Sequence, residues 1–113
     1  MPQFRVDVAS EGADVVARVF GEVDLATAPV LLTATQEASG AGLLVVDLTE
    51  TEFLDSSGCR ALATAGRSAR AGGGRLAVVC PKENVAVYRV VELVGLAAVV
   101  DLHSTVSSAR ATG

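Results

Sequence analysis

The stretch Phe53-Leu54-Asp55-Ser56-Ser57-Gly58 organises the interpretation of the whole chain. It follows an apolar run at Leu43–Leu48 that is typical of a buried strand, and it precedes an Ala-rich segment at Cys59–Ala71 that is typical of a helix. Asp and Ser at such a junction cap helices well, because a side-chain oxygen accepts a hydrogen bond from a free backbone N–H. Two adjacent hydroxyls at a helix N-terminus also suit a phosphorylation switch, since backbone N–H groups and the helix dipole there favour a phosphate.

The composition indicates one domain with a core of small side chains. The chain has 113 residues, half of them hydrophobic, with no Trp, one Tyr and three Phe, and its net charge is −4. That length suits a single domain over residues 1–113. The sequence has no basic stripe of the kind a nucleic-acid binder shows, no apolar run of roughly 18 residues for a membrane span and no signal-peptide pattern. Two cysteines are too few for a secreted disulfide framework, so we expect a cytoplasmic protein.

The order of the expected elements predicts an α/β domain. A hairpin of two strands (4–8 and 14–20) is followed by a helix that Thr27 caps, with Pro29 in its first turn. The remaining expected elements are strand 43–48, loop 49–54, helix 56–71, strand 75–80, a helix from Asn84 to Gly95, strand 97–100, and a helical tail from Ser104 with a frayed end at 106–113. Strand–helix alternation implies a mixed, mostly parallel sheet of about five strands with helices and an N-terminal β-hairpin.

Polar side chains are expected at the carboxyl ends of the parallel strands, where ligands and partners meet such a sheet. Three loops lead there, at 21–26, 49–58 and 81–84. They carry acidic and hydroxyl side chains and a single lysine: Glu22, Asp24, Thr27, Thr49, Glu50, Asp55, Ser56, Ser57 and Lys82. The sequence therefore predicts an acidic, hydroxyl-rich edge.

No catalytic or metal-binding pattern stands out, so we expect no enzymatic activity, no metal and no cofactor. A serine nucleophile needs a base within reach, and the one histidine, His103, lies near a chain end in a sequence without a nucleophile elbow. Cys59 and Cys80 lack the spacing of a metal site. Cys59 follows the hydroxyl pair at a helix N-terminus, which would lower its thiol pKa and permit a redox role. A small core-facing cysteine is the plainer interpretation.

Two segments resemble those of a known family. Gly21-Glu22-Val23-Asp24-Leu25-Ala26-Thr27-Ala28-Pro29 is similar to the Gly-Glu-Leu-Asp segment of bacterial anti-sigma factor antagonists. Val45-Val46-Asp47-Leu48 and then Phe53–Gly58 resemble that family's strand and its Asp-Ser-Ser/Thr-Gly phosphorylation motif. These proteins are single STAS domains, and the resemblance covers essentially the whole chain in element order and length.

The resemblance implies a non-enzymatic regulator of sigma-factor-dependent transcription that works by partner switching. Such a protein binds an anti-sigma factor with serine kinase activity, loses that binding when the kinase phosphorylates it with ATP, and is reset by a serine phosphatase. The modified residue is usually the one before the glycine, which here is Ser57, with Ser56 as the alternative. The resemblance and the predicted edge together place partner binding at seven residues: Glu22, Asp24, Thr27, Asp55, Ser56, Gly58 and Arg60.

The sequence departs from the family pattern after the motif glycine. Family members usually continue with Leu and a small residue, whereas this chain has Cys59 and Arg60. Arg60 lies within a turn of Ser57 and can pair with a phosphate there, or with an acidic partner before phosphorylation. Two other functions stay open: a STAS module that binds a small ligand or nucleotide, and a domain that senses redox state through Cys59 or Cys80.

Overall fold

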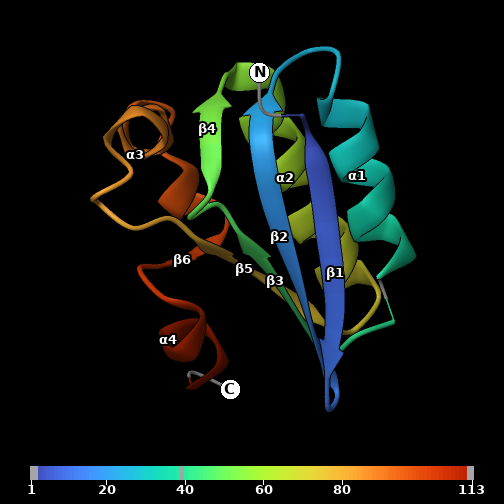
Figure 1. Ribbon diagram of the computed structural model, residues 1–113. Helices are drawn as coiled ribbons and strands as arrows, with labels where there is room; N and C mark the ends of the chain where they lie inside the picture. The colour runs from blue at the N-terminus through green and yellow to red at the C-terminus, as the bar shows by residue number, and fades with distance from the viewer. Residues whose placement is uncertain (1–2, 39, 112–113) are drawn as a thin grey trace.

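A six-stranded sheet organises the domain, which the computed structural model describes over residues 3–38 and 40–111. In chain order the elements are β1 (Arg5–Glu11), β2 (Asp14–Val23), α1 (Ala28–Glu37), β3 (Leu43–Asp47), β4 (Thr51–Leu54), α2 (Ser56–Ala71), β5 (Arg75–Val79), α3 (Val85–Leu93), the 3-10 helix η1 (Leu96–Ala98), β6 (Asp101–His103) and α4 (Val106–Ala111). β1 and β2 pair antiparallel, and the other strand pairs in the described residues are parallel. The predicted mixed, mostly parallel sheet with an N-terminal hairpin is confirmed (Figure 1).

Strand β2 is long enough to pair with two parallel strands, β3 and β4. Residues 14–18 pair with β3, and the residues from Gly21 to Val23 pair with β4, with a register shift between Gly21 and Glu22. Gly21 has a φ of +88°, and a Cβ there would lie 3.0 Å from the Cα of Phe4, so the bend requires glycine. The sequence predicts that this strand ends at residue 20 and that residues 49–54 form a loop. Both predictions are wrong, because the four-residue β4 has no apolar alternation and pairs only with the continuation of β2.

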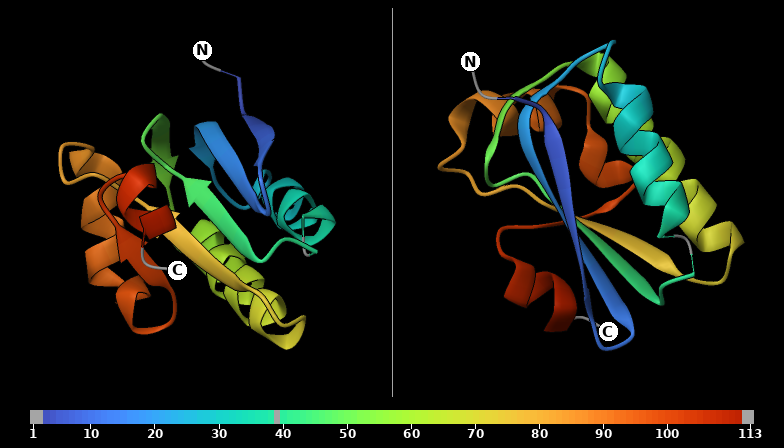
Figure 2. Two further views of the ribbon diagram at one scale, coloured as in Figure 1. Left: turned by 90° about the horizontal axis from the view of Figure 1, so that it is seen from below. Right: turned by 45° about the vertical axis from the view of Figure 1, so that its right-hand side comes forward.

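Helices cover the two faces of the sheet unequally. α1 and α2 lie on one face, over the larger core, in which Leu31 and Leu62 are fully buried. α4 lies on the opposite face, where Ala109 packs over Val16 and Val45 (Figure 2). All five residues of β3 are buried between these layers. Coverage on both faces explains why this strand appears in the sequence as an unbroken apolar run.

The last strand lies later in the chain than the sequence analysis placed it. Residues 97–100 form a 3-10 turn and bend, and β6 begins at Asp101. Leu96 and Val100 are buried at a helical spacing of four residues, so the apolar run does not have strand periodicity. The expected helical tail is α4, in which Arg110 contacts Asp14 and Glu11 at 3.0 and 3.1 Å. Residues 112–113 lie outside the described residues. No helix in the described part of the chain has the length and apolar character needed to cross a membrane.

Candidate functional site

The N-terminal ends of α1 and α2 lie next to each other where β2 and β4 end (Figures 1 and 2). A groove of about 250 Å³ separates the two helices there, and we call it the α1–α2 groove. Its lining is Leu25, Ala28, Pro29, Leu32, Ser57, Arg60, Ala61 and Thr64. The groove brings together the two segments that carry the sequence motifs, although they lie about thirty residues apart in the chain.

Asp55 begins helix α2, as the sequence predicts. Its Oδ1 accepts hydrogen bonds from the backbone N–H groups of Ser57 at 2.9 Å and Gly58 at 3.1 Å. The N–H of Asp55 in turn donates to the carbonyl of Val23 at 3.1 Å, which joins the start of α2 to the end of β2. The sequence predicts that backbone N–H groups in the first turn of α2 could bind a phosphate. In the structure, those of Ser57 and Gly58 already donate to the carboxylate of Asp55.

The two motif serines differ in their surroundings. Ser56 is exposed, whereas Ser57 is half-buried and lines the α1–α2 groove. Neither hydroxyl makes a hydrogen bond to any residue that the structure describes. Both hydroxyls are therefore available, but only Ser57 lies beside the apolar lining and Arg60.

Gly58 is a packing residue beneath the site. A Cβ at this position would collide with the Leu54 side chain and would lie 2.8 Å from Cγ1 of Val23. Gly58 is buried, so it supports the site by letting α2 start close against β2 and β4. The expected contact between Gly58 and a partner stays a prediction, and the structure shows only the packing of this buried glycine.

Asp24 and Thr27 shape the loop before α1. Oδ1 of Asp24 accepts the N–H groups of Ala26 and Thr27, both at 3.0 Å, and the N–H of Asp24 donates to Thr27 Oγ1 at 2.9 Å. The Thr27 hydroxyl donates to the carbonyl of Glu22 at 2.8 Å. Thr27 stands at the N-cap position, but its side chain does not cap α1 as predicted, because these loop contacts occupy it.

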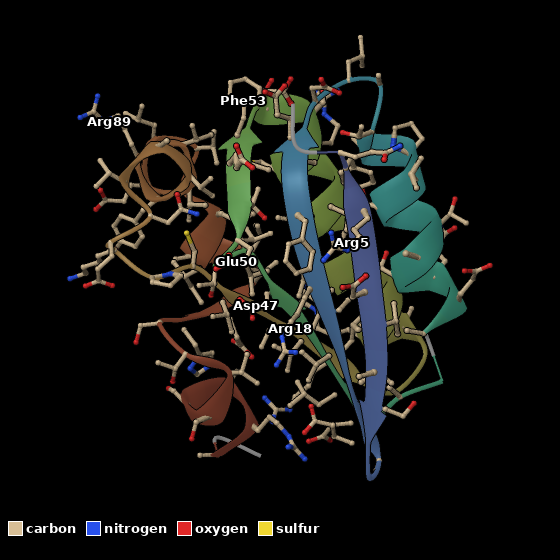
Figure 3. All side chains as sticks on the ribbon, in the orientation of Figure 1. Arg5, Arg18, Asp47, Glu50, Phe53 and Arg89 are labelled. Atoms are coloured by element: carbon tan, nitrogen blue, oxygen red, sulfur yellow. The ribbon has the colours of Figure 1, made fainter. Side chains whose placement is uncertain are left out.

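Two exposed apolar side chains lie near the ends of β2 and β4, and sequence reasoning missed their exposure. Leu25, in the loop that Asp24 orders, is 78% exposed, and Phe53 on β4 is 46% exposed. Phe53 pairs in register with the exposed Glu22. Figure 3 shows Phe53 near the end of β4. The sequence does contain a signal for the exposure of Phe53, because no other apolar residue lies two to four positions from it, at strand or helix spacing. Exposed apolar groups gathered beside polar ones are typical of protein-binding surfaces.

Arg60 differs from most arginines of this chain in having no partner. It is exposed and makes no ion pair or hydrogen bond within residues 3–38 and 40–111. By contrast, Arg18 lies 3.7 Å from Asp47 on the open face of the sheet (Figure 3), and Arg5 lies 3.1 Å from Asp7. The α1–α2 groove thus has an unpaired guanidinium, that of Arg60, at its border.

The predicted polar edge is divided into two places. A second hollow, of about 720 Å³, lies between the β3–β4 and β5–α3 turns and is lined by Thr49, Glu50, Thr51, Glu52, Pro81, Glu83 and Asn84. Nδ2 of Asn84 donates to the carbonyls of Leu48 at 3.0 Å and Thr51 at 2.8 Å, and the Asn84 side chain makes no capping hydrogen bond to α3. The division arises because β2 continues beyond β3, which places Phe53 and Glu50 at opposite ends of β4 (Figure 3).

Both cysteines are core residues. Cys59 is 5% and Cys80 1% exposed. Burial raises the pKa of each thiol to about 11, with further contributions from Asp55 at Cys59 and from Asp47 at Cys80. The prediction that the helix N-terminus lowers the pKa of Cys59 is therefore wrong, and a buried neutral thiol is poorly suited to redox sensing. Among the described residues, no group of three or more His, Cys, Asp and Glu side chains could hold a metal ion.

One domain family accounts for nearly all of the chain. The profile of the STAS domain matches residues 5–109. The chain belongs to the STAS domain family. Among proteins of curated function, none matches this STAS domain significantly.

Solved structures of other STAS-like chains resemble this one closely. An anti-sigma factor antagonist from Mycobacterium paratuberculosis is 29% identical, with a TM-score of 0.86, over 97% of this chain and 93% of that chain. The anti-sigma factor antagonist SpoIIAA in its unphosphorylated form is 22% identical, with a TM-score of 0.72, over 96% and 93%. The Bacillus cell fate determinant SpoIIAA in its phosphorylated form is 21% identical, with a TM-score of 0.66, over 97% and 98%. The two SpoIIAA structures support the fold alone.

Proposed function

We propose that this STAS domain is an anti-sigma factor antagonist that binds an anti-sigma factor with serine kinase activity and is released when that kinase phosphorylates Ser57. The observation that carries this proposal is the free hydroxyl of Ser57 at an apolar groove bordered by the unpaired Arg60. The similarity to the Mycobacterium paratuberculosis antagonist supports the same class of function. The circuit would operate in the cytoplasm, where ATP and sigma factors are present.

The surface around Ser57 suits a protein partner. Leu25 and Phe53 offer apolar side chains that a partner can bury, and buried apolar anchors supply most of the energy of protein interfaces. Glu22 is exposed beside Phe53 and adds negative charge at the rim. We expect the partner to place a complementary apolar pocket against Leu25 and a basic side chain against Glu22.

The chemistry of the switch belongs to the partner's active site. Oγ of Ser57 attacks the γ-phosphorus of ATP, so that a new O–P bond forms while the bond to the bridging β–γ oxygen breaks. ADP leaves, and the hydroxyl proton passes to a base of the kinase. This domain contributes only the acceptor hydroxyl, which agrees with a non-enzymatic role. A serine phosphatase restores the hydroxyl with water and releases inorganic phosphate.

A phosphate on Ser57 would end binding through charge and bulk. It adds about −1.5 to −2 charges at neutral pH, next to Asp55, whose carboxylate accepts the N–H of Ser57. It also occupies the groove that receives the partner. A loss of about 1.4 kcal/mol weakens affinity tenfold, so a modest repulsion suffices. Because Asp55 keeps the helix capped, the fold should remain intact after modification.

Paired variants of the two serines test this proposal. The partner is the kinase captured from a lysate of the source organism, and its affinity is measured by calorimetry. We expect Ser57→Ala to bind like wild type and to resist inactivation by ATP, and Ser57→Asp to fold normally and bind at least tenfold more weakly. Ser56→Ala and Ser56→Asp are the matched controls and should behave like wild type. Wild-type affinity of Ser57→Asp, with phosphate still incorporated into Ser57→Ala, would contradict the proposal.

A further inference from the structure

We propose that Arg60 is the intramolecular clamp for the phosphate on Ser57: after modification its guanidinium closes onto the phosphate at the α1–α2 groove. The inference rests on the proposed phosphorylation of Ser57 and specifies how that site is regulated. Its consequence is that a single modification changes two groups, because it adds the phosphate and withdraws the free positive charge of Arg60.

The first turn of α2 has few hydrogen-bond donors to spare for a phosphate. The N–H groups of Ser57 and Gly58 donate to Oδ1 of Asp55, and the N–H of Cys59 donates to the carbonyl of Asp55 at 3.1 Å. A phosphoserine brings three strong acceptor oxygens. Since the N–H groups of Ser57, Gly58 and Cys59 are occupied, a side chain is the strongest further donor that the phosphate could gain from this domain.

Arg60 is the side chain in place to do so. It follows Ser57 by three residues on α2, a spacing that puts two side chains on the same helix face. Both residues line the same groove. The other cations without a partner in the described residues, Lys82, Arg70 and Arg89, do not line it. An Arg–phosphate pair is frequently bidentate, with two charge-assisted hydrogen bonds.

The hydroxyl of Thr64, one turn after Arg60 on α2, also lines the groove but is bonded to a different arginine. Thr64 Oγ1 accepts a hydrogen bond at 3.2 Å from Arg67, the next arginine along α2. Arg67 is thereby directed to the middle of the helix and provides a matched cation that should not reach Ser57. Without the phosphate, Arg60 is exposed and offers its charge to a carboxylate of the partner.

The electrostatic surroundings make the clamp measurable. The acidic groups at the ends of the elements that meet here are Asp55 at the N-cap of α2, Glu22 and Asp24 at the end of β2 and in the following loop, and Glu52 on β4. Helix α2 also carries Arg67 and Arg70, which do not line the groove, and no charged residue of α1 lines it. These carboxylates disfavour the dianion of a phosphoserine, and Arg60 favours it. The change caused by removing Arg60 alone therefore isolates the clamp.

The experiment installs phosphoserine at position 57 of the full chain during translation, so that no kinase is needed, and follows its second ionisation by phosphorus NMR. The second pKa of a free phosphoserine is about 6. We expect Arg60→Gln to raise the pKa of the phosphoserine by about half a unit to one unit relative to wild type, and Arg67→Gln to leave it unchanged. Phosphoserine installed at position 56, outside the groove, should depend less on Arg60.

The outcomes separate this inference from the function on which it rests. Titration curves that coincide for wild type and Arg60→Gln, or that shift equally with phosphoserine at 56 and 57, would overturn the clamp. Circular dichroism confirms that each variant is folded, which is expected because Arg60 is exposed and unpaired. Failure of the natural kinase to modify Ser57 would overturn the proposed switch, whereas the titration of the installed phosphoserine reports on the clamp alone.

Discussion

The α1–α2 groove and the hollow between the β3–β4 and β5–α3 turns lie at opposite ends of β4, and they use their polar groups differently. In the groove, the hydroxyl of Ser57 and the guanidinium of Arg60 have no partner within the described chain. In the hollow, the amide of Asn84 donates to the carbonyls of Leu48, Thr49 and Thr51, while Glu50 and Glu83 carry like charges. Polar residues at these two sites thus divide into those that satisfy the backbone and those that have no partner within the described residues.

The largest effect we expect is on partner binding, and it tests whether the α1–α2 groove and the hollow differ in function. Leu25→Asp puts a charge where the proposed interface buries an apolar side chain, and the exposed position should leave stability unchanged. We expect the affinity for the captured kinase to fall about two-hundredfold, corresponding to about 3 kcal/mol. Glu83→Gln, in the acidic hollow, is the matched control and should bind as wild type. Equal losses for the two variants would mean that the contrast between the two regions is wrong.

A smaller effect is expected on stability at the base of the groove. Gly58→Ala places a Cβ against Leu54 and Val23 in a packed region and should lower the free energy of unfolding by about 2 to 3 kcal/mol. Gly66→Ala on the same helix is the control, because its Cβ would meet only Val100 Cγ1 at 3.2 Å and Val99 O at 3.8 Å. Helix propensity offsets that contact, so we expect a change within about 1 kcal/mol. Urea denaturation measures both, and equal stability of the two variants would contradict this packing role.

Asn84 in the hollow should matter for stability and not for binding. Asn84→Ala removes the hydrogen bonds to the carbonyls of Leu48 and Thr51 and should cost about 1 to 2 kcal/mol of unfolding free energy. Lys82→Ala, exposed in the same turn, should change it by less than about 0.5 kcal/mol. Thermal denaturation and kinase binding are measured side by side. If folded Asn84→Ala bound the kinase more weakly than wild type, the hollow would also be part of the interface.

The smallest expected effect appears only at alkaline pH. The folded-state pKa of Cys59 and Cys80 is raised to about 11, above the ordinary value of 9.0, so the native state holds these protons more tightly. Their contribution to stability is constant below pH 9 and is lost as the pH rises from about 9 towards 11. A double variant, Cys59→Ala with Cys80→Ala, should show a shallower decline over that interval in urea denaturation. If the unfolding free energies of variant and wild type fell in parallel with pH, the thiols would not be the cause of the decline.

Much of the fold follows from patterns that are local in the sequence. Buried strands such as β3, the capping of α2 by Asp55 and the end of α3 at Gly95 each depend on neighbouring residues. β4 was missed because its four residues gain strand geometry only from β2. The run 97–100 was misread because hydrophobic residues alone do not distinguish a strand from a helical turn.

The site was predictable in its residues and not in its geometry. The two motifs predict that the segments 21–29 and 53–58 meet at one edge of the sheet, and the α1–α2 groove is lined by Leu25 of the first segment and Ser57 of the second. That Asp55 already occupies the helix N–H groups, or that Leu25 projects into solvent, depends on side-chain directions that spacing does not determine. The burial that raises the pKa of Cys59 is likewise a property of the packed core.

The most direct test of the central claim maps the modified serine. The recombinant protein is used to capture partners from a lysate of its source organism, with and without ATP. Mass spectrometry then identifies the partners and the chymotryptic peptide of residues 55–62, which contains both Ser56 and Ser57. We predict capture of an anti-sigma factor kinase without ATP, and its release with ATP as phosphate appears on Ser57. Capture of no kinase, or release of the kinase with Ser57 unmodified, would contradict the account.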